Sequence, residues 1–214
     1  MSAQTYWNTI GSKKVFEDPF YLDKLSPFLS QTSQIVEYGC GYGRVLRILK
    51  SKGYHHLLGF DFAPNMILRG KKENPDLDLR VLEESEEIPC RDESVDAVVL
   101  STVLCCIVEP KKLMGEVFRV LKKGGVVYIA DFLLSEHPRY EEKYAQGMRQ
   151  FGKLGIYTTH DQLTVRHYAV QEIFDLLREF EIQWFEPFDF KTMNQNPART
   201  FHCIAKKPDL GLVR

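Results

Sequence analysis

The sequence predicts an α/β fold: a doubly wound, mostly parallel seven-stranded sheet with an antiparallel last strand and a small inserted helical cap. From residue 35 onward, short apolar runs alternate with helical patterns of roughly 10–15 residues, which is typical of right-handed crossovers between parallel strands. This alternation stops after Asp131 and resumes with a helical pattern at Val170. Two strand-like runs then close the chain around a loop that suits antiparallel pairing better than another crossover. The length of 214 residues suits one such domain.

The first segment, residues 1–34, is expected to form short helices that lead into the core. It is rich in aromatic side chains, and Pro19 and Pro27 interrupt any long helix.

The second segment, residues 35–132, is expected to be the core of the sheet. Its clearest helix lies near 110–122, because Pro110 suits a first helical turn, Gly124 and Gly125 stop the helix, and apolar residues recur at helical spacing between them. The expected strands lie near 35–38, 56–60, 78–82, 95–100 and 125–130, and the expected helices near 43–52, 64–73 and 110–122.

The remaining residues divide into a cap, 133–168, and a C-terminal helix and hairpin, 169–207. The last segment predicts a helix from Val170 to Phe180 that covers the sheet, followed by strands at 181–188 and 200–206. The stretch 133–165 carries little strand signal. It holds side chains that can line a pocket: His137, Arg139, Tyr140, Tyr144, Arg149, Tyr157, His160 and Asp161.

Composition and charge exclude several classes of protein. An apolar fraction of 44% and a charged fraction of 27% are ordinary for a globular core. A formal net charge of −1 gives no reason to expect strong non-specific attraction to nucleic acid or to anionic membranes. The five cysteines lack the paired spacing of a zinc site, and no apolar run reaches the length of a membrane span. We therefore expect a cytoplasmic protein with no metal site.

A glycine-rich loop follows the first strand of the core. Residues 35–43 read Ile-Val-Glu-Tyr-Gly-Cys-Gly-Tyr-Gly, an apolar run with an acid and then three glycines at alternate positions. A loop with no side chain at three points lets the backbone approach a ligand, and the helix after it presents its amino terminus. Asp61, at the end of the next strand, is placed to accept both ribose hydroxyls of a nucleoside. A helix cap or turn role is the alternative for Asp61.

The spacing of the glycines discriminates between nucleoside cofactors. Gly39, Gly41 and Gly43 are one residue tighter than the Gly-x-Gly-x-x-Gly pattern that binds nicotinamide or flavin dinucleotides. Glu37 would repel a pyrophosphate, whereas it can favour a cationic amino-acid group. A nicotinamide-dependent dehydrogenase is therefore ranked last.

Glu37-Tyr-Gly-Cys-Gly-Tyr-Gly43 resembles the first motif of class I S-adenosylmethionine-dependent methyltransferases. Three further segments resemble the same family in the same order: 59–67, 84–98 and 119–125. The resemblance spans roughly residues 35–132 and is closest to the small-molecule branch. It implies a Rossmann-like fold, with S-adenosyl-L-methionine as the cofactor and S-adenosyl-L-homocysteine as its product.

The resemblance also implies roles for the residues around the loop. Gly39, Gly41 and Gly43 would line the methionine portion of the cofactor, and Glu37 would support its ammonium group. Asp61 would bind the ribose hydroxyls.

The same resemblance places further residues around the adenine and the sulfonium. Phe62 and Met66 would pack against the adenine, although their spacing also suits the core face of a helix. Glu84 would accept a hydrogen bond from the adenine amine and Ser85 would contact the ring through its backbone. Glu84 also suits a solvated acidic run. Ser101 would line the floor beneath the sulfonium.

The resemblance implies that residues 1–34 form an N-terminal helical lid. Tyr6 and Trp7 would be its aromatic part, and a satellite apolar cluster is an equally good interpretation of both side chains. Cys105 and Cys106 lie where many relatives carry histidine, and we interpret them as buried thiols packed as small apolar groups.

No motif of the family fixes a catalytic base, so the candidates come from the cap. We favour the run Tyr157-Thr-Thr-His-Asp161, which places polar and aromatic groups together without a core period. His160, Tyr157 and Tyr168 are the candidate catalytic residues, with a surface position as the alternative for His160. Arg166 and His167 can equally be boundary residues that face solvent.

The leading hypothesis is a methyltransferase that acts on a nitrogen, oxygen or sulfur atom of a small molecule. Ser101-Thr-Val-Leu104 does not resemble the Asn/Asp-Pro-Pro-aromatic motif of enzymes that methylate DNA bases, so duplex DNA is not expected as a partner. A transfer RNA or protein methyltransferase, and an inactive cofactor-binding regulatory protein, remain the alternatives. The sequence leaves a monomer and a homodimer open.

Overall fold

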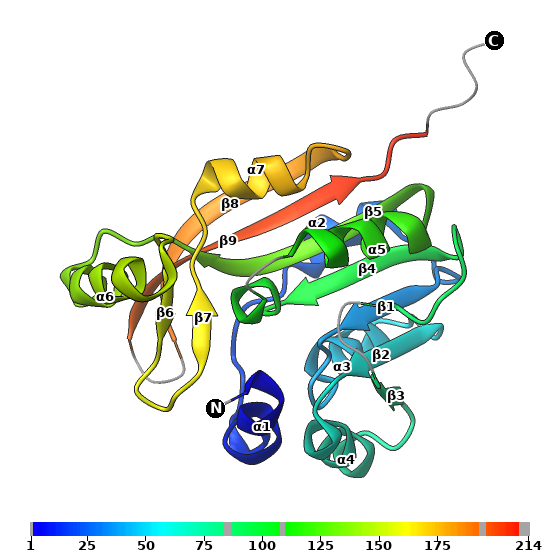
Figure 1. The fold of residues 1–214 in the computed structure, drawn as a ribbon. Coiled ribbons are helices and arrows are strands. Elements are labelled where there is room, and N and C mark those ends of the chain that lie inside the picture. Colours follow the sequence, from blue (N-terminus) through cyan, green and yellow to red (C-terminus); the bar gives the residue numbers. More distant parts are fainter. Residues whose placement is uncertain (1, 84–86, 108–109, 193–195, 210–214) are drawn as a thin grey trace.

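A sheet of seven strands runs through the computed structural model, which describes residues 2–83, 87–107, 110–192 and 196–209 (Figure 1). The strand order is β3-β2-β1-β4-β5-β9-β8. The strands are β1 (Ile35–Tyr38), β2 (Leu57–Asp61), β3 (Asp78–Val81), β4 (Val95–Ser101), β5 (Leu121–Leu133), β8 (Glu181–Lys191) and β9 (Pro197–Lys206).

Strands β3, β2, β1, β4 and β5 are parallel, as the alternating pattern predicts. β1 pairs with β2 on one side and with β4 on the other, so that Tyr38 lies opposite both Phe60 and Leu100. The order of the strands in the chain reverses at this point. In open α/β sheets such a reversal leaves a crevice at the carboxyl ends of the strands, where ligands bind.

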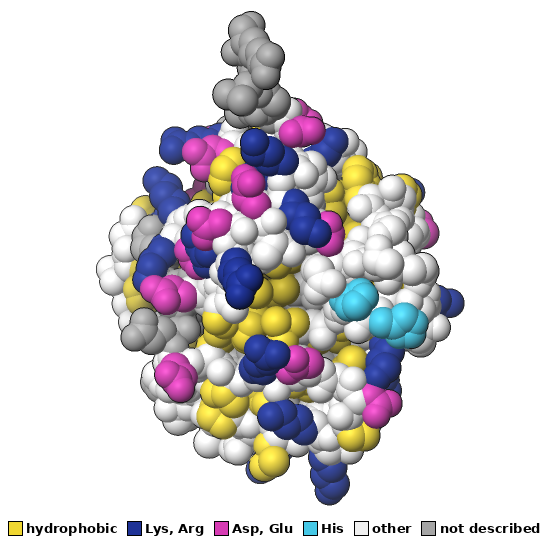
Figure 2. Space-filling model, turned by 90° about the vertical axis from the view of Figure 1, so that its right-hand side faces the viewer, with side chains coloured by type: hydrophobic (Ala, Val, Ile, Leu, Met, Phe, Trp, Pro, Cys, Tyr) yellow, Lys and Arg dark blue, Asp and Glu magenta, His cyan; other side chains and the backbone are white. Residues whose placement is uncertain are grey.

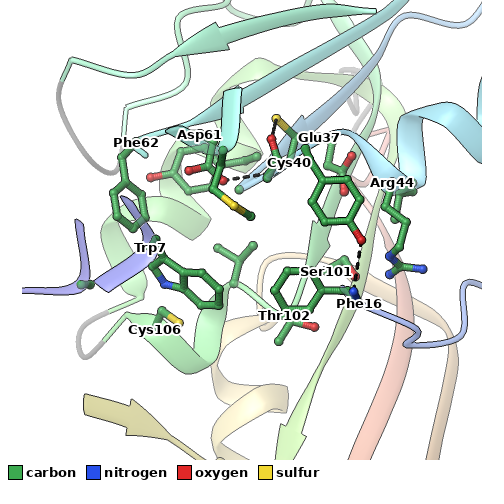
Figure 3. A pocket seen from close by; sticks show the side chains of 18 of the residues that line it. Trp7, Phe16, Glu37, Cys40, Arg44, Asp61, Phe62, Ser101, Thr102 and Cys106 are labelled. Carbon is green, nitrogen blue, oxygen red and sulfur yellow. Dashed lines mark hydrogen bonds between the residues drawn. The ribbon is translucent and has the colours of Figure 1, made fainter. Parts of the chain in front are cut away.

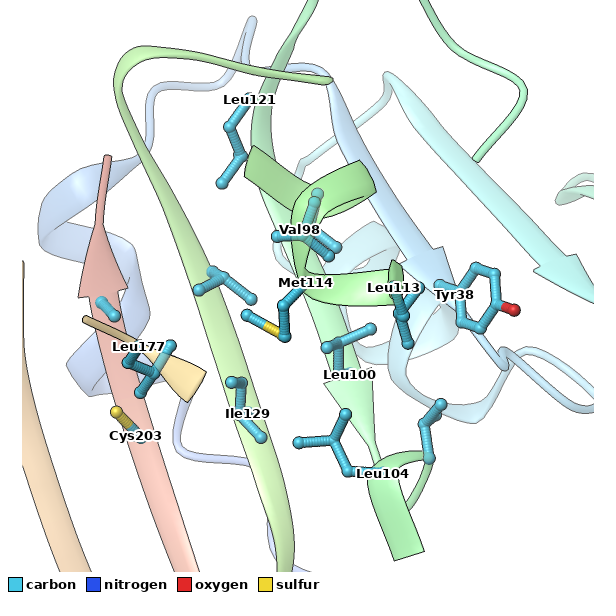
Figure 4. Packing of buried hydrophobic residues seen from close by; sticks show 14 of the residues in the cluster. Tyr38, Val98, Leu100, Leu104, Leu113, Met114, Leu121, Ile129, Leu177 and Cys203 are labelled. Carbon is cyan, nitrogen blue, oxygen red and sulfur yellow. The ribbon is translucent and has the colours of Figure 1, made fainter. Parts of the chain in front are cut away.

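Helices cover both faces of the sheet (Figure 1). Along β4, Val98 and Leu100 belong to one apolar cluster, and Ala97 and Val99 to the other. The first cluster includes residues of α5 (Lys111–Val120) and α7 (Val170–Leu176), and Figure 4 shows Leu113 and Met114 packed over this face. Each fully buried side chain of this kind contributes about 1.5–3 kcal/mol to stability. The second cluster includes residues of α2 (Leu22–Leu25), α3 (Arg44–Ser51) and α4 (Pro64–Glu73).

The C-terminal hairpin confirms the predicted antiparallel last strand. β9 pairs antiparallel with both β5 and β8, and therefore lies inside the sheet, with β8 at the edge. Both strands are longer than the sequence predicts, because the polar residues between them continue the ladder, with Lys191 paired to Pro197. The connection between the two strands is therefore shorter than the one expected between residues 188 and 200, because β8 ends at Lys191 and β9 begins at Pro197.

The transition from α5 to β5 also differs in detail from the prediction. The helix ends at Val120, and Leu121 already pairs with Val95. The pairing register then shifts between Val95 and Ala97, and Gly124 has φ +76°. The two glycines therefore allow an irregular strand start, and the helix stops before it reaches them.

The stretch 133–165, which carries little strand signal in the sequence, contains a helix and two very short strands. Between β5 and α7 lie a 3-10 turn (Pro138–Tyr140), α6 (Glu141–Phe151), and an antiparallel hairpin of β6 (Ile156–Thr158) and β7 (Thr164–Arg166). Three-residue strands give no readable alternation in a sequence. The hairpin is held by α6: a Cβ on Gly147 would lie 1.7 Å from the carbonyl oxygen of Ile156, so only glycine permits this approach.

The N-terminal segment consists of α1 (Ala3–Thr9) and short 3-10 turns at Gly11–Lys13 and Ser26–Phe28. α1 packs on α4, where the backbone N–H of Asn65 donates to Oδ1 of Asn8 over 3.0 Å. Nδ2 of Asn65 also donates to the carbonyl of Asn8 over 2.8 Å. This part of the chain is therefore attached to the same edge of the sheet as the crevice.

Acidic and basic side chains are interspersed on the face shown in Figure 2, with hydrophobic side chains between them. Neither sign of charge dominates this face, in keeping with the net charge of −1. In the part of the chain that the structure describes, every helix is too short or too polar to span a membrane.

Candidate functional site

A cavity of about 560 Å³ lies in the crevice at the carboxyl ends of β1, β2 and β4 (Figure 3). Its volume is within the range of small-molecule and cofactor sites. The glycine loop forms one side, Ser101 and Thr102 form the floor, and Trp7 and Phe16 of the N-terminal segment also line the cavity.

The glycine loop adopts a backbone that other residues rarely adopt. Gly39, Gly41 and Gly43 have φ values of +72°, +55° and +82°. A Cβ on Gly39 would lie 2.5 Å from Cγ2 of Val103, and one on Gly41 would lie 2.8 Å from Cε of Met66. The loop therefore needs glycine both for its backbone angles and for its close contacts.

Asp61 fixes the loop to the end of β2. Its Oδ2 accepts a hydrogen bond from the N–H of Gly41 over 2.8 Å, and its Oδ1 accepts one from the N–H of Ala63 over 2.8 Å. Burial raises the pKa of the Asp61 carboxyl, whereas the two N–H donors lower it. The carboxylate lines the cavity, and each oxygen keeps lone-pair capacity for a further donor such as a ribose hydroxyl.

Glu37 points into the cavity from the end of β1 (Figure 3). It is 3% exposed, and its Oε2 atom has no hydrogen-bond partner among the residues that the structure describes. Burial raises its pKa to about 8, against a smaller lowering by Arg44. A buried carboxylate oxygen without a donor is costly, so this position suits a ligand that brings a cation.

Apolar and aromatic side chains form the wall opposite Glu37. Trp7 and Phe16 pack on a small cluster that contains Met66, and Phe62 lines the cavity beside it. Gln4 ties the N-terminal segment to this wall by donating from Nε2 to the carbonyl of Phe62 over 3.1 Å. The wall is suited to a flat, apolar ring.

The floor contains a residue with an uncommon backbone. Thr102 has φ +60°, and its N–H donates to the carbonyl of Ala130 over 2.7 Å. A non-glycine residue in this region costs on the order of 1–3 kcal/mol, which neighbouring structure must offset. Such strain is often found at ligand sites.

A second cavity, of about 400 Å³, adjoins the first. The two share Trp7, Phe16, Thr102 and Cys106 as lining residues. The second cavity extends under the cap, between the end of β5, α6 and the β6–β7 hairpin.

His167 forms the polar centre of the second cavity. Its Nδ1 bonds to the hydroxyl of Tyr144 over 2.8 Å and its Nε2 to the hydroxyl of Tyr157 over 3.1 Å. Its ring stacks on Phe132 at 5.2 Å and 11°. Burial, aided by Lys143, lowers the pKa of His167 to about 3, so that the ring is neutral at physiological pH.

Asp161, in the turn between β6 and β7, joins the cap to the N-terminal lid. Its Oδ2 accepts from the hydroxyl of Tyr6 over 2.7 Å and pairs with Nζ of Lys14 at 3.1 Å. Burial alone would raise the pKa of Asp161, but hydrogen bonds from Thr159, Tyr6 and Lys14 hold it well below its ordinary value. These contacts close one side of the second cavity.

Comparison with known proteins identifies a domain in the chain. Residues 36–129 match a family model described as a methyltransferase domain. A structure of an S-adenosylmethionine-dependent methyltransferase from Methanosarcina mazei superposes with a TM-score of 0.82 at 24% identity, covering 90% of this chain and 99% of that one. Residues 36–129 carry a methyltransferase domain. A domain of this family and fold implies S-adenosylmethionine as its cofactor.

Curated relatives resemble the domain over part of their length. Demethylmenaquinone methyltransferase of Renibacterium salmoninarum is 36% identical over 84 residues, which are 39% of this chain and 34% of the relative. Phosphatidylethanolamine N-methyltransferase of Cereibacter sphaeroides is 28% identical over 106 residues, 46% of this chain and 50% of the relative. The chain therefore spans about a third to a half of the length of these relatives.

The structure gathers most of the predicted cofactor residues of the methyltransferase domain around the first cavity. Gly43 is not among its lining residues and instead precedes the first turn of α3. Glu84 and Ser85 lie outside the described residues. The predicted residues that line the cavity are Glu37, Gly39, Gly41, Asp61, Phe62, Met66 and Ser101.

The three candidate catalytic residues are separated by the structure. His160 and Tyr157 line the second cavity, with His160 exposed in the turn beside Asp161. Tyr168 lines neither cavity. Its side chain is fully buried, and its hydroxyl lies 2.8 Å from the carbonyl of Leu104 and 3.1 Å from that of Ile107. These contacts do not fit the catalytic role predicted for Tyr168.

Replacement of Tyr168 by phenylalanine is expected to lower the free energy of unfolding by about 1–2 kcal/mol, because the hydrogen bond of the hydroxyl to the carbonyls of Leu104 and Ile107 is lost. Urea denaturation measures this loss, and calorimetry is expected to show little change in S-adenosylhomocysteine affinity. Loss of methyl transfer with an unchanged unfolding free energy would instead support the catalytic role.

The sequence missed Lys143 as a lining residue of the second cavity. It lies in the charged run Glu141-Glu-Lys143, which suggests a solvated helix face. Arg139 lies in the 3-10 turn before α6 and Lys143 in the first turn of α6, and the structure brings both to the second cavity.

Proposed function

We propose that this protein transfers the methyl group of S-adenosylmethionine to a small molecule held in the second cavity. One observation carries the proposal: a cavity suited to the methyl donor shares four lining residues with an aromatic cavity beneath the cap. The shared residues Thr102 and Cys106 lie at the junction, where donor and acceptor would meet.

The residues of the first cavity support the donor part of the proposal. The carboxylate of Glu37 would pair with the ammonium of the methionine group, which removes the cost of its buried oxygen. Asp61 would accept from the ribose hydroxyls, and Phe62 and Met66 would contact the adenine.

The bound cofactor supplies an electrophilic methyl group on a sulfonium. The chain then has to place the acceptor atom in line with the methyl–sulfur bond and exclude water. Such alignment can account for much of the acceleration of methyl transfer. Trp7 and Phe16 contribute to both tasks, because they line both cavities and shield the junction from solvent.

The second cavity favours an acceptor that arrives with a reactive electron pair. His167 is a weak base there, since burial lowers its pKa to about 3 and both ring nitrogens bond to tyrosines. Burial also raises the pKa of Tyr157 well above its ordinary value, so its hydroxyl stays protonated. Both groups would orient the acceptor by hydrogen bonding.

The acceptor atom need not be the nitrogen, oxygen or sulfur expected from the sequence. The relatives include enzymes named for methylation of demethylmenaquinone, a C-methyltransferase of ubiquinone and menaquinone biosynthesis, and an N-methyltransferase. We therefore include carbon among the acceptor atoms of a small molecule. A reducing, cytoplasmic setting is part of the proposal and is supported by five free cysteines.

Two measurements test the proposal. Calorimetry should show stoichiometric binding of S-adenosylhomocysteine, and a radiolabelled methyl donor should transfer its methyl to members of a small-molecule acceptor panel. Absence of S-adenosylhomocysteine binding would refute the donor site.

These measurements, together with a test of transfer RNA binding, separate the alternatives. Tight S-adenosylhomocysteine binding without turnover on a broad panel would support a regulatory protein. A salt-dependent association with bulk transfer RNA, accompanied by methylation of that RNA, would support an RNA methyltransferase.

A further inference from the structure

We infer that the acceptor is a flat, largely apolar molecule with an anionic group, and that Arg139 and Lys143 bind this group. The inference rests on the proposed function, because it takes the second cavity as the acceptor site. It adds the chemical class of the acceptor and two residues that select it.

The residues that line the second cavity carry an excess of positive charge. Its charged lining residues are Lys14, Arg139, Lys143 and Asp161. Asp161 is engaged by Lys14, at 3.1 Å. Throughout the described ranges, neither Arg139 nor Lys143 forms an ion pair, whereas Arg149 of the same helix pairs with Glu142 at 2.9 Å on the surface. Two cations thus face one cavity without a carboxylate of the described residues to neutralise them.

The surroundings of Lys143 make its charge costly in the absence of a ligand. Burial lowers its pKa, and the neighbouring charge of Arg139 lowers it further. An anion between the two cations would raise the pKa of Lys143 again, because its attraction opposes the like-charge repulsion from Arg139.

Aromatic rings hold both cations in place. The guanidinium of Arg139 lies 5.3 Å from the ring centre of Tyr140. Nζ of Lys143 lies 5.5 Å from the ring centre of Tyr140 and 5.3 Å from that of Tyr157. These contacts are within the range of cation–π attraction. They orient the two cations before any acceptor binds, which reduces the entropy cost of binding an anion.

The remainder of the cavity is suited to a planar, apolar body. Trp7, Phe16, Phe132 and Tyr157 contribute ring surfaces to its lining, and Phe132 is backed by the stacked ring of His167. A cavity of about 400 Å³ holds roughly two aromatic rings, since a cavity of roughly 150 Å³ binds one benzene. The anionic end would lie at Arg139 and Lys143, and the reacting end at Thr102 and Cys106, where the cavities join.

The test uses matched acid and amide probes: benzoate with benzamide, 2-naphthoate with 2-naphthamide, and 4-phenylbenzoate with its amide. Calorimetry with the full chain saturated with S-adenosylhomocysteine should show at least one acid bound tenfold or more tightly than its amide. The double variant R139Q/K143Q should remove this preference and leave S-adenosylhomocysteine affinity unchanged. The matched control is R149Q, which removes a cation from the outer side of the same helix and should keep the preference.

Equal affinity for acid and amide in every pair overturns the inference, as does failure of all six probes to bind at millimolar concentration. Retained preference in R139Q/K143Q overturns the assignment of the two residues. The comparison of acid with amide needs only the unmodified protein, so it stands if the double variant does not fold. Because S-adenosylhomocysteine binding is measured first, loss of the donor site is distinguished from loss of the acceptor preference.

Discussion

Replacement of Glu37 by glutamine is expected to stabilise the ligand-free protein and to weaken cofactor binding at least tenfold. The carboxyl of Glu37 has a folded-state pKa of about 8, above its ordinary value of 4.5, because it is buried. Between these two pH values the folded protein binds more protons than the unfolded chain, so stability falls as the pH rises through this window. Glutamine removes this titration and also removes the charge that would pair with the cofactor's ammonium.

Chemical denaturation at several pH values measures the first effect. At pH 8 the unfolding free energy of E37Q should exceed that of the unmodified protein by on the order of 4 kcal/mol, with the gap closing near pH 4.5. Calorimetry with S-adenosylhomocysteine measures the second effect. The control is E17Q, since Glu17 is an exposed acid of the N-terminal segment. A destabilised E37Q with intact cofactor affinity would contradict both the burial argument and the donor site.

The second large effect is expected for Asp61→Ala. The backbone N–H groups of Gly41 and Ala63 would lose their acceptor, which should cost about 2–4 kcal/mol of stability. S-adenosylhomocysteine affinity should fall tenfold or more, because the ribose hydroxyls lose their carboxylate and the glycine loop loses its anchor. The losses of stability and of affinity in Asp61→Asn should lie between those of Asp61→Ala and zero. The asparagine amide nitrogen cannot accept a hydrogen bond from either N–H group, whereas the amide oxygen still can.

Thermal unfolding and calorimetry measure the two losses for Asp61→Ala separately. D76A is the matched control, because Asp76 is a largely exposed carboxylate paired with Lys50 at 3.4 Å, away from the cavity. Cofactor affinity unchanged in D61A would mean that the site has been placed wrongly.

The sheet could be predicted because its signals are local. A continuous apolar strand such as β4 and an apolar helical stripe such as α5 each lie within a few neighbouring residues. The rule of right-handed crossovers then leaves few topologies. The antiparallel pairing of β8 with β9 also follows from the short connection between them.

The cap could not be predicted in the same way. The β6–β7 hairpin has three paired residues in each strand, and it depends on Gly147 allowing α6 to approach Ile156. That contact can be recognised only when the position of α6 relative to the hairpin is known. Strand propensity over three residues is too weak to outweigh the polar character of the segment.

The two halves of the site differ for the same reason. The donor half lies in a loop and two strand ends, so the positions of Glu37, Gly41 and Asp61 could be predicted from their spacing together with the family resemblance. The acceptor half is built from segments far apart in the chain, as in the contact between Tyr6 and Asp161. No sequence period reports such a contact, which explains why Lys143 was missed and Tyr168 was given a role that its packing does not fit.

The interior position of β9 has a consequence for biosynthesis. β9 is made after the other six strands, yet it pairs with β5 across Val126 to Leu133. At roughly 5–20 residues per second, a ribosome needs on the order of 4–15 seconds to add the residues that separate the end of β5 from the end of β9. During that time the apolar edge of β5 has no partner, and an unpaired edge invites strand pairing with other chains. The nascent protein is therefore most prone to aggregation just before its last strand emerges.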